Sequence, residues 1–234
     1  MYIKALIKFS KESAYREDLI DGKIYFRSIE AIRKDSNDPF DSYSSKISIA
    51  HGNLMLLTRP DSLKPITCFY AVMDEKESDT VNIKLQKDEI EELGNSLGKY
   101  LTVIKDVPRF VDLIKQLKLR IWYGCCDYSY NKIPLIPEFN KRNRFSIEQE
   151  FRLLVDGIVI APNNSTLAPE YYQNFCVLDK GMYVNIGDIS EFSERHSLED
   201  VERGVNVKVN FDKMKNEKNN LCNLDDYVKE YRLN

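Results

Sequence analysis

The chain has 234 residues, enough to bury a substantial core as one large domain or two small ones. Hydrophobic residues make up 43% and charged residues 30%, a balance that excludes a disordered, collagenous or membrane-spanning chain. The 34 Lys and Arg against 37 Asp and Glu leave a net charge of -3, so no global basic field can gather nucleic acid or an anionic membrane surface.

The N-terminal segment shows no targeting signal. Lys4 and Lys8 interrupt the apolar residues among the first ten, so the segment lacks the apolar core of a signal peptide. No stretch approaches the roughly 18 apolar residues that a membrane-spanning helix needs. We therefore expect a cytoplasmic protein with no membrane association.

Strand and helix patterns alternate over the first half of the chain. Apolar residues two apart predict a strand over residues 2–9, and Ser10 is placed to cap a short helix that ends at Asp21 and Gly22. A strand over 23–27 is followed by Ser28, which can cap a helix through residue 33. The turn-forming residues of 35–45 predict a loop. Further strands are expected over 46–49, 53–58, 66–73, 81–86, 100–105 and 119–124, and helices over 88–98 and 108–117.

Short elements dominate the second half. Residues 126–145 show no period, and a strand is expected over 148–155. Further strands are expected over 175–178, 183–186 and 205–209, with Ser197 capping a short helix. The tail from about residue 211 could form a separate helical extension, with a helix over 224–231. Since no repeat or flexible linker divides residues 1–234, we predict one α+β domain with a mainly antiparallel twisted sheet and short flanking helices.

The sequence predicts neither a metal site nor a disulfide framework. The five cysteines are odd in number and include no CxxC pair. The adjacent Cys125 and Cys126 either form a redox pair or point to opposite faces of a strand. The oxygen-rich loop 35–45 lacks the order of an EF-hand. His51 and His196 belong to no recognisable triad, and no GxSxG, P-loop, GxGxxG or HExxH motif is present.

The strongest local signal is the strand sequence FSIEQEFRLLV at 145–155. Alternation predicts that one face of this strand packs inward, through Phe151, Leu153 and Val155. The other face carries Glu148, Glu150 and Arg152. Two carboxylates on one face lie roughly 7 Å apart, so their repulsion can raise the pKa of one of them, as in many catalytic carboxylates. Arg152 acts against this, because it favours the ionised form. The alternative is a solvent-facing strand whose charges pair with a neighbouring strand.

Two further regions carry residues suited to a nucleotide. An aromatic stretch precedes the basic run 141–144: Trp122, Tyr123, Tyr128, Tyr130 and Phe139. Aromatic faces stack on bases and guanidinium groups bind phosphates, although a core strand followed by a solvated loop has the same composition. Arg27 and Ser28, at a strand end, could likewise bind a phosphate, unless Arg27 pairs with Asp38 or Asp41.

Four strings in this chain resemble a family of uncharacterised bacterial and phage proteins. They are LIKFSKE, LIDGKIYFRSIEAIRKDSNDPFDSY, RFSIEQEFRLLV and YVNIGDISEF, within residues 3–43, 144–155 and 183–192. The family shares an opening strand, a "G-lY" strand before an aspartate-rich turn, a "Q/E-x-E-[FWY]-R" strand and a closing "iGDisD" turn. This resemblance implies a component of the conflict between phages and their hosts.

The sequence Glu148-Gln149-Glu150 is also similar to the E-x-E or Q-x-E element of ADP-ribosyltransferases. That resemblance implies that Glu150 is the catalytic carboxylate, that Glu148 orients the acceptor, and that NAD is the cosubstrate. It further implies an NAD-binding set: Arg27 and Ser28 at the phosphates, an aromatic wall from Tyr123, Tyr128 or Phe145, and Arg152 beside Glu150. The chain departs from those enzymes because it has no Ser-Thr-Ser element and its arginine lies on the second predicted strand.

Two other functions remain open. The first is a non-catalytic interaction protein of phage defence or counter-defence, which binds a host or phage protein and in which Glu148, Glu150 and Arg152 are structural charges. The second is single-stranded nucleic-acid binding through residues 141–144, against which the near-neutral charge balance argues.

Overall fold

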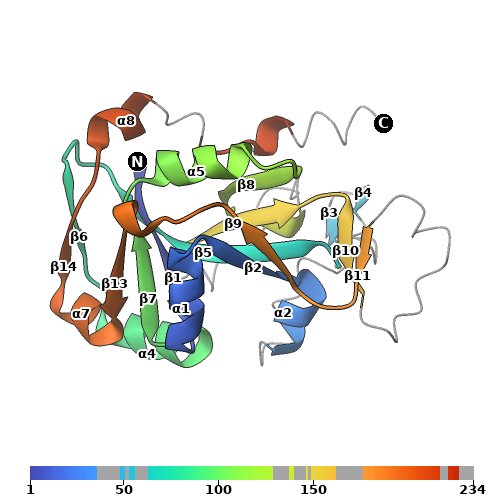
Figure 1. Ribbon diagram of the computed structural model, residues 1–234, viewed down its shortest axis with the longest axis horizontal. Helices are drawn as coiled ribbons and strands as arrows, with labels where there is room; N and C mark the ends of the chain where they lie inside the picture. The colour runs from blue at the N-terminus through green and yellow to red at the C-terminus, as the bar shows by residue number, and fades with distance from the viewer. Residues whose placement is uncertain are drawn as a thin grey trace.

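The computed structural model describes residues 1–35, 48–50, 53–55, 63–128, 137–139, 146, 149–161, 176–216 and 221–226. One eight-stranded sheet, with only antiparallel pairs, dominates these ranges (Figure 1). Its strands are β1 (Tyr2–Ser10), β2 (Lys23–Ser28), β5 (Pro65–Asp74), β7 (Tyr100–Ile104), β8 (Ile121–Cys125), β9 (Glu150–Val155), β12 (Met182–Asn185) and β13 (Ser193–Ser197). The predicted α+β class with a mainly antiparallel sheet is confirmed.

Small strand pairs and short helices surround this sheet. The pairs are β3 (Ser48–Ala50) with β4 (Asn53–Met55), β6 (Thr80–Ile83) with β14 (Val205–Lys208), and the parallel pair β10 (Ile158–Ile160) with β11 (Cys176–Leu178). The helices include α1 (Ser13–Ile20), α2 (Ile29–Asp35), α4 (Lys87–Leu97), α5 (Val107–Lys115), α7 (Leu198–Arg203), α8 (Phe211–Asn216) and the 3-10 turns η2 (Pro137–Phe139) and η4 (Ser190–Phe192). Across the described ranges, no helix combines the length and apolar character needed to cross a membrane.

The sheet divides at β5. One edge of β5 pairs with β9, which in turn pairs with β8. The other edge pairs with β2 only at Pro65 and Ile66, and with β1 from Tyr70 to Asp74. Between these two contacts the sheet separates into a β2–β12 wing and a β1–β7–β13 wing, and α1 connects β1 to β2 where the wings part (Figure 1).

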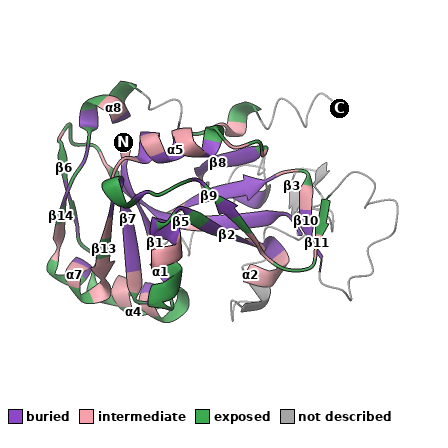
Figure 2. Ribbon diagram, in the orientation of Figure 1, coloured by how far each residue is buried: buried purple, intermediate pink, exposed green. Residues whose placement is uncertain are grey.

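Three hydrophobic clusters cover the two faces of the sheet. The first lies on one face, under α1 and α5, and includes Phe69, Phe110 and Phe151. The opposite face carries two separate clusters. One lies beside α4, α7, α8 and the β6–β14 pair, and the other beside α2 and η2. The central strands are therefore buried on both faces (Figure 2).

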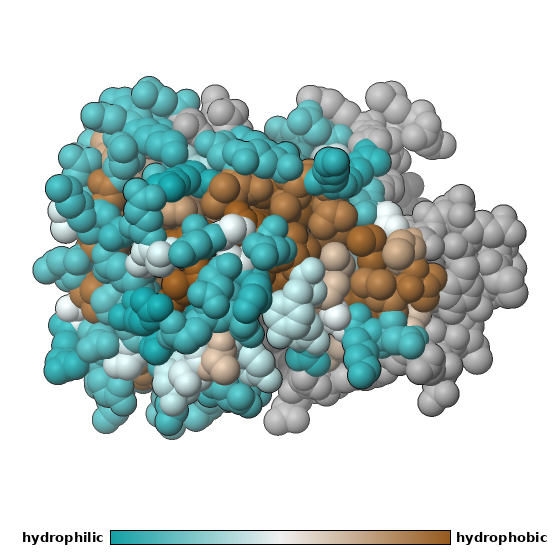
Figure 3. Space-filling model, in the orientation of Figure 1, coloured by the Kyte–Doolittle hydropathy of each residue, from teal (hydrophilic) through white to brown (hydrophobic). Residues whose placement is uncertain are grey.

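Apolar residues of the first cluster reach the surface in part. Figure 3 shows hydrophobic residues at the surface across the middle of this face, interrupted by hydrophilic residues. Partly buried side chains that pack against this cluster include Leu117, Ile158 and Met182.

Helix capping follows the predictions at two helices and departs from them at a third. The hydroxyl of Ser28 accepts from the Ala31 N–H at 3.1 Å and caps α2, and Ser197 forms a capping box at α7. The predicted cap at Ser10 is wrong, because Ser10 is the last residue of β1 and α1 begins at Ser13 without a side-chain cap.

Two motifs of the family resemblance pack against each other. Gly22 follows α1 with a φ of 83° and Gly187 follows β12 with the same φ, a conformation that favours glycine. A Cβ on Gly22 would lie 1.9 Å from the carbonyl oxygen of Gly187. The Ile186 N–H donates to the Gly22 carbonyl at 2.9 Å, and the Ile189 N–H donates to the Ile20 carbonyl at 2.9 Å. The glycines of both motifs therefore join the end of α1 to the turn after β12.

The described parts of the C-terminal tail lie against the sheet. Phe211 and Met214 of α8 are buried, and the Lys4 ammonium lies 3.9 Å from the centre of the Phe211 ring. Further along, the side chain of Asn223 binds the edge of β8: its Oδ1 accepts from the Tyr123 N–H at 2.8 Å, and its Nδ2 donates to the Ile121 carbonyl at 3.0 Å. The remaining residues of the predicted helix, 227–231, lie outside the described ranges.

Candidate functional site

The charged face of β9 is not exposed to solvent, so the alternative of a solvent-facing strand is wrong. β9 lies between β5 and β8, and Arg152 is only 8% exposed. Phe151 and Leu153 pack into the first cluster, as predicted. On the opposite face, Glu150 pairs with Tyr70, which belongs to the cluster beside α4, α7 and α8. Leu154, further along β9, belongs to the cluster beside α2 and η2. Glu150 and Arg152 therefore lie in a polar seam between two hydrophobic clusters.

Glu150 and Arg152 form a tight ion pair at this seam. The Arg152 Nε and Nη2 both donate to Glu150 Oε2, at 2.9 and 2.5 Å. The two side chains are 12% and 10% exposed, so the pair is weakly solvated and its geometry is fixed. The neighbouring carboxylate and thiols more than offset the cost of burial, and they raise the pKa of Arg152 well above its usual value. Arg152 therefore stays charged and holds the carboxylate of Glu150 in one position.

Residues from the end of β8 complete the surroundings of Glu150. The Cys126 thiol lies 3.6 Å from Glu150 Oε2, and the hydroxyl of Tyr128 accepts from the Glu150 N–H at 2.8 Å. Burial, with added repulsion from Cys126 and Glu150, raises the pKa of the Tyr128 phenol, so this hydroxyl stays protonated. Cys125 instead packs against the first cluster, which confirms that the two adjacent cysteines face opposite sides.

A second buried ion pair supports Arg152 from behind. Arg152 Nη1 donates to the backbone carbonyl of Glu138. The Glu138 side chain is 2% exposed and its Oε1 lies 3.4 Å from Lys64 Nζ, which lies 3.9 Å from Asp156 Oδ1. Buried charges of alternating sign stabilise one another, so the removal of one charge leaves its neighbour without a counter-charge. The sequence reasoning missed Lys64 and Glu138, because each is a single charge in a short segment without period.

The backbone immediately before Glu150 has an unusual conformation. Gln149 has a φ of 36°, which a residue with a side chain adopts only at a cost. Its carbonyl accepts from the Ala71 N–H at 2.8 Å, which anchors the segment to β5. The strand begins at Glu150, so strand alternation cannot be extended through Gln149. Glu148 and Phe145, predicted for the same site, lie outside the described residues, as do residues 141–144.

The other predicted residues are distributed over both faces of the sheet. Arg27 is half-buried on β2, opposite Ile66, and so shares the face of Glu150. Ser28 is buried and its hydroxyl caps α2. Tyr123 packs in the first cluster, its ring centre 6.5 Å from that of Phe151, on the face opposite Glu150. The structure thus brings together Glu150, Arg152 and Tyr128, and separates them from Tyr123.

Comparison with known proteins adds no further assignment. The chain matches no protein-family model, no curated protein and no solved structure. Within the described ranges, no group of three or more His, Cys, Asp and Glu side chains is arranged to bind a metal ion. The functional argument therefore depends on the geometry around Glu150.

Proposed function

We propose that this chain is an ADP-ribosyltransferase-like protein of the conflict between bacteria and phages, and that it uses NAD in the cytoplasm to modify a host or phage macromolecule. The observation that carries this proposal is the carboxylate of Glu150, which Arg152 fixes through two hydrogen bonds to one oxygen. The strained backbone at Gln149, next to this carboxylate, supports a functional site there.

The proposed chemistry needs a fixed anion. When the bond between nicotinamide and ribose breaks, positive charge develops on the sugar, and an oriented carboxylate stabilises that charge. Glu150 is oriented by Arg152 and by the contact between its own N–H and Tyr128. Glu148 would orient the acceptor.

The predicted NAD-binding residues fit this proposal in part. Arg27 lies on the same face of the sheet as Glu150, and the hydroxyl of Tyr128 contacts the backbone N–H of Glu150 directly. Arg152 is occupied by Glu150 and Glu138, so its role is to position Glu150 rather than to contact NAD. Ser28 and Tyr123 are buried in other contacts, so any aromatic wall must come from Tyr128 or Phe145.

Nicotinamide release from NAD tests this proposal. We expect the wild-type protein to release nicotinamide and Glu150→Gln to lose at least a hundredfold in kcat, because the amide carries no charge to stabilise the sugar. Glu191→Gln is the matched control, since Glu191 pairs with Arg109 on the exposed surface, and it should retain full activity. If the wild type neither binds nor turns over NAD, and Glu150→Gln keeps its biological activity, the proposed ADP-ribosyltransferase activity is refuted.

A second candidate, the non-catalytic interaction protein, is favoured by exposed tyrosines on the β2–β12 wing. Tyr25 and Tyr183 are 43% and 53% exposed, and their ring centres lie 4.8 Å apart. Tyrosine is enriched at the centres of protein interfaces. If this function holds, the double variant Tyr25→Ser, Tyr183→Ser loses its effect on phage infection while Glu150→Gln retains it. The opposite pattern supports the enzyme.

A further inference from the structure

Three strands of the sheet have a single strand partner among the described residues: β8, β12 and β13. The other edge of β8 binds the side-chain amide of Asn223. β13 has the sequence SERHS, and charged side chains on an outer strand oppose pairing with another molecule. β12 has the sequence MYVN and carries no charge. Of these three outer strands, β12 is the one that has neither the amide of another segment nor a charge.

The backbone groups of β12 alternate between β2 and the outer edge. The Ile186 N–H donates to the Gly22 carbonyl at 2.9 Å, and the register with β2 then directs the backbone groups of Val184 to β2 as well. The N–H and C=O groups of Tyr183 and Asn185 point the other way. Within the described residues these groups form no hydrogen bond. An outer strand with open backbone groups is a template for an added strand.

The side chains of β12 form one aromatic face and one apolar face. Tyr183 is exposed, and its ring lies beside that of Tyr25 on β2. On the other face, Val184 is buried in the first cluster, and Met182 packs against this cluster where it reaches the surface. A strand added to β12 would therefore continue both an aromatic surface and an apolar one.

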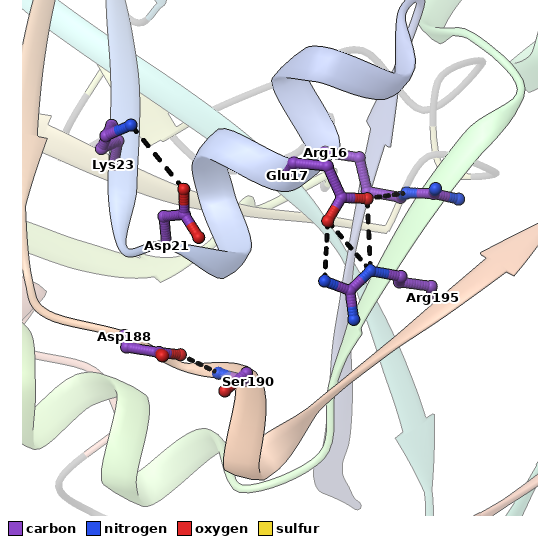
Figure 4. A network of polar contacts seen from close by, with 7 residues as sticks. All are labelled: Arg16, Glu17, Asp21, Lys23, Asp188, Ser190 and Arg195. Carbon is purple, nitrogen blue, oxygen red and sulfur yellow. Dashed lines mark hydrogen bonds and ion pairs between the residues drawn. The ribbon is translucent and has the colours of Figure 1, made fainter.

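Charged groups that flank β12 are engaged within the chain. Lys23 of β2 pairs with Asp18 at 3.2 Å and with Asp21 at 3.8 Å. Asp188, in the turn after β12, accepts from the Ser190 N–H at 2.7 Å (Figure 4). Neither Lys23 nor Asp188 therefore offers an uncompensated charge that would oppose the approach of a second uncharged strand.

We propose that β12 is a dimerisation strand, which pairs antiparallel with β12 of a second copy of this chain across a two-fold axis at Val184. In this register Tyr183 faces Asn185 of the second copy, and each such pair exchanges two backbone hydrogen bonds. The two Tyr183 rings lie on a diagonal, within reach of each other. The same alignment brings the exposed Lys180 to the end that holds Asp188 of the second copy, which has the opposite charge. The interface is thus complementary to itself, as a two-fold axis requires.

The proposed contact is small, because it involves one short strand and its flanking turns. Interfaces below about 1,200 Å² are typical of weak, reversible complexes, so we expect dissociation in the micromolar range. The pairing uses the edge of β12. It depends neither on the chemistry proposed at Glu150 nor on partner binding by the face that carries Tyr25 and Tyr183.

Sedimentation equilibrium at increasing protein concentration tests the proposal. We expect the mass of the wild type to rise from that of a monomer towards that of a dimer. Tyr183→Pro removes an N–H that points outward and none that bonds β2, so this variant should fold and remain a monomer. Tyr183→Ser is the matched control, because it loses the same ring but keeps the N–H, and it should still dimerise, although more weakly.

An engineered disulfide tests the register. Val184 faces its own equivalent in a pair whose Cα atoms lie about 4.5 Å apart, which a disulfide can bridge. The exposed Cys176 and Cys222 are first replaced by Ser. Glutathione disulfide should then oxidise Val184→Cys to a covalent dimer, with release of two reduced glutathione molecules. Leu97→Cys, at the exposed end of α4, is the control and should stay monomeric.

Three results would overturn the pairing. The first is a wild type that stays monomeric into the high micromolar range. The second is equal dimerisation of Tyr183→Pro and Tyr183→Ser, because the association would then not involve the edge of β12. The third is crosslinking of Val184→Cys no faster than that of Leu97→Cys.

Discussion

At the scale of single residues, the most consequential side chain is Arg152. It contacts the carboxylate of Glu150 and the backbone of Glu138, and so connects the candidate catalytic residue to the buried charges around Lys64. A buried arginine in this position has two effects. It holds Glu150 in place, and it makes the fold depend on a buried charge whose partners are themselves buried.

Replacement of Arg152 should therefore be costly. In Arg152→Met the carboxylate of Glu150 loses its partner, and we expect the free energy of unfolding to fall by about 3 to 5 kcal/mol in urea titration. Arg203→Met is the control, because Arg203 pairs with Asp200 on the exposed surface of α7, and its loss should cost less than about 1 kcal/mol. Equal effects of the two substitutions would contradict the buried ion pair.

At the scale of elements, the contact between the turns after α1 and β12 should be sensitive to any side chain. Gly22→Ala places a methyl group 1.9 Å from the Gly187 carbonyl in addition to the strain of a positive φ. Gly157 has a φ of 75° with nothing within 4 Å of a Cβ, so Gly157→Ala measures strain alone. We expect Gly157→Ala to cost about 1 to 2 kcal/mol and Gly22→Ala clearly more, by chemical denaturation. Similar losses would mean that the two turns separate without cost.

Local sequence patterns predicted some helices and strands of this fold and missed others. Alternation and capping residues predicted β2, β5, α4 and the caps at Ser28 and Ser197, because these signals are local. β13, with the sequence SERHS, was missed, because its strand conformation comes from pairing with β7 rather than from β-forming residues. The covered face of β9 was also missed. Arg152 reads as exposed until the carbonyl of Glu138, distant in the chain, is known to lie beside it.

At the scale of the whole molecule, several carboxyl groups in or beside the wing that ends at β13 accept hydrogen bonds that favour their ionised form. Arg195 and other hydrogen-bond donors lower the pKa of several carboxyl groups there: Glu17, Asp188, Glu191, Glu194 and Asp200. A carboxyl group with a lowered pKa in the folded state stabilises the fold above its unfolded pKa, about 4 to 4.5, and this contribution is lost as the pH falls through the folded value.

Acid should consequently weaken this wing. We expect the free energy of unfolding to decline below about pH 4.5, and to decline less steeply in Glu17→Gln, which lacks one of the titrating groups. Urea titrations of both proteins between pH 7 and pH 3 measure the two slopes. Identical slopes would show that the contact between Glu17 and Arg195 adds no stability in solution.

The contact between Asn223 and β8 has a consequence for solubility. Among the strands of the described residues, β8 pairs only with β9. The amide of Asn223 satisfies one donor and one acceptor on β8 as a neighbouring strand would. An outer strand with open backbone groups is a template for pairing with another molecule. In Asn223→Ala we expect self-association beyond a dimer to increase with protein concentration in light scattering, while a surface change such as Asn206→Ala behaves as the wild type does. The side-chain amide of Asn223, together with its backbone N–H, which donates to the Tyr123 carbonyl at 3.2 Å, would then be what keeps copies of this protein from joining their sheets at β8.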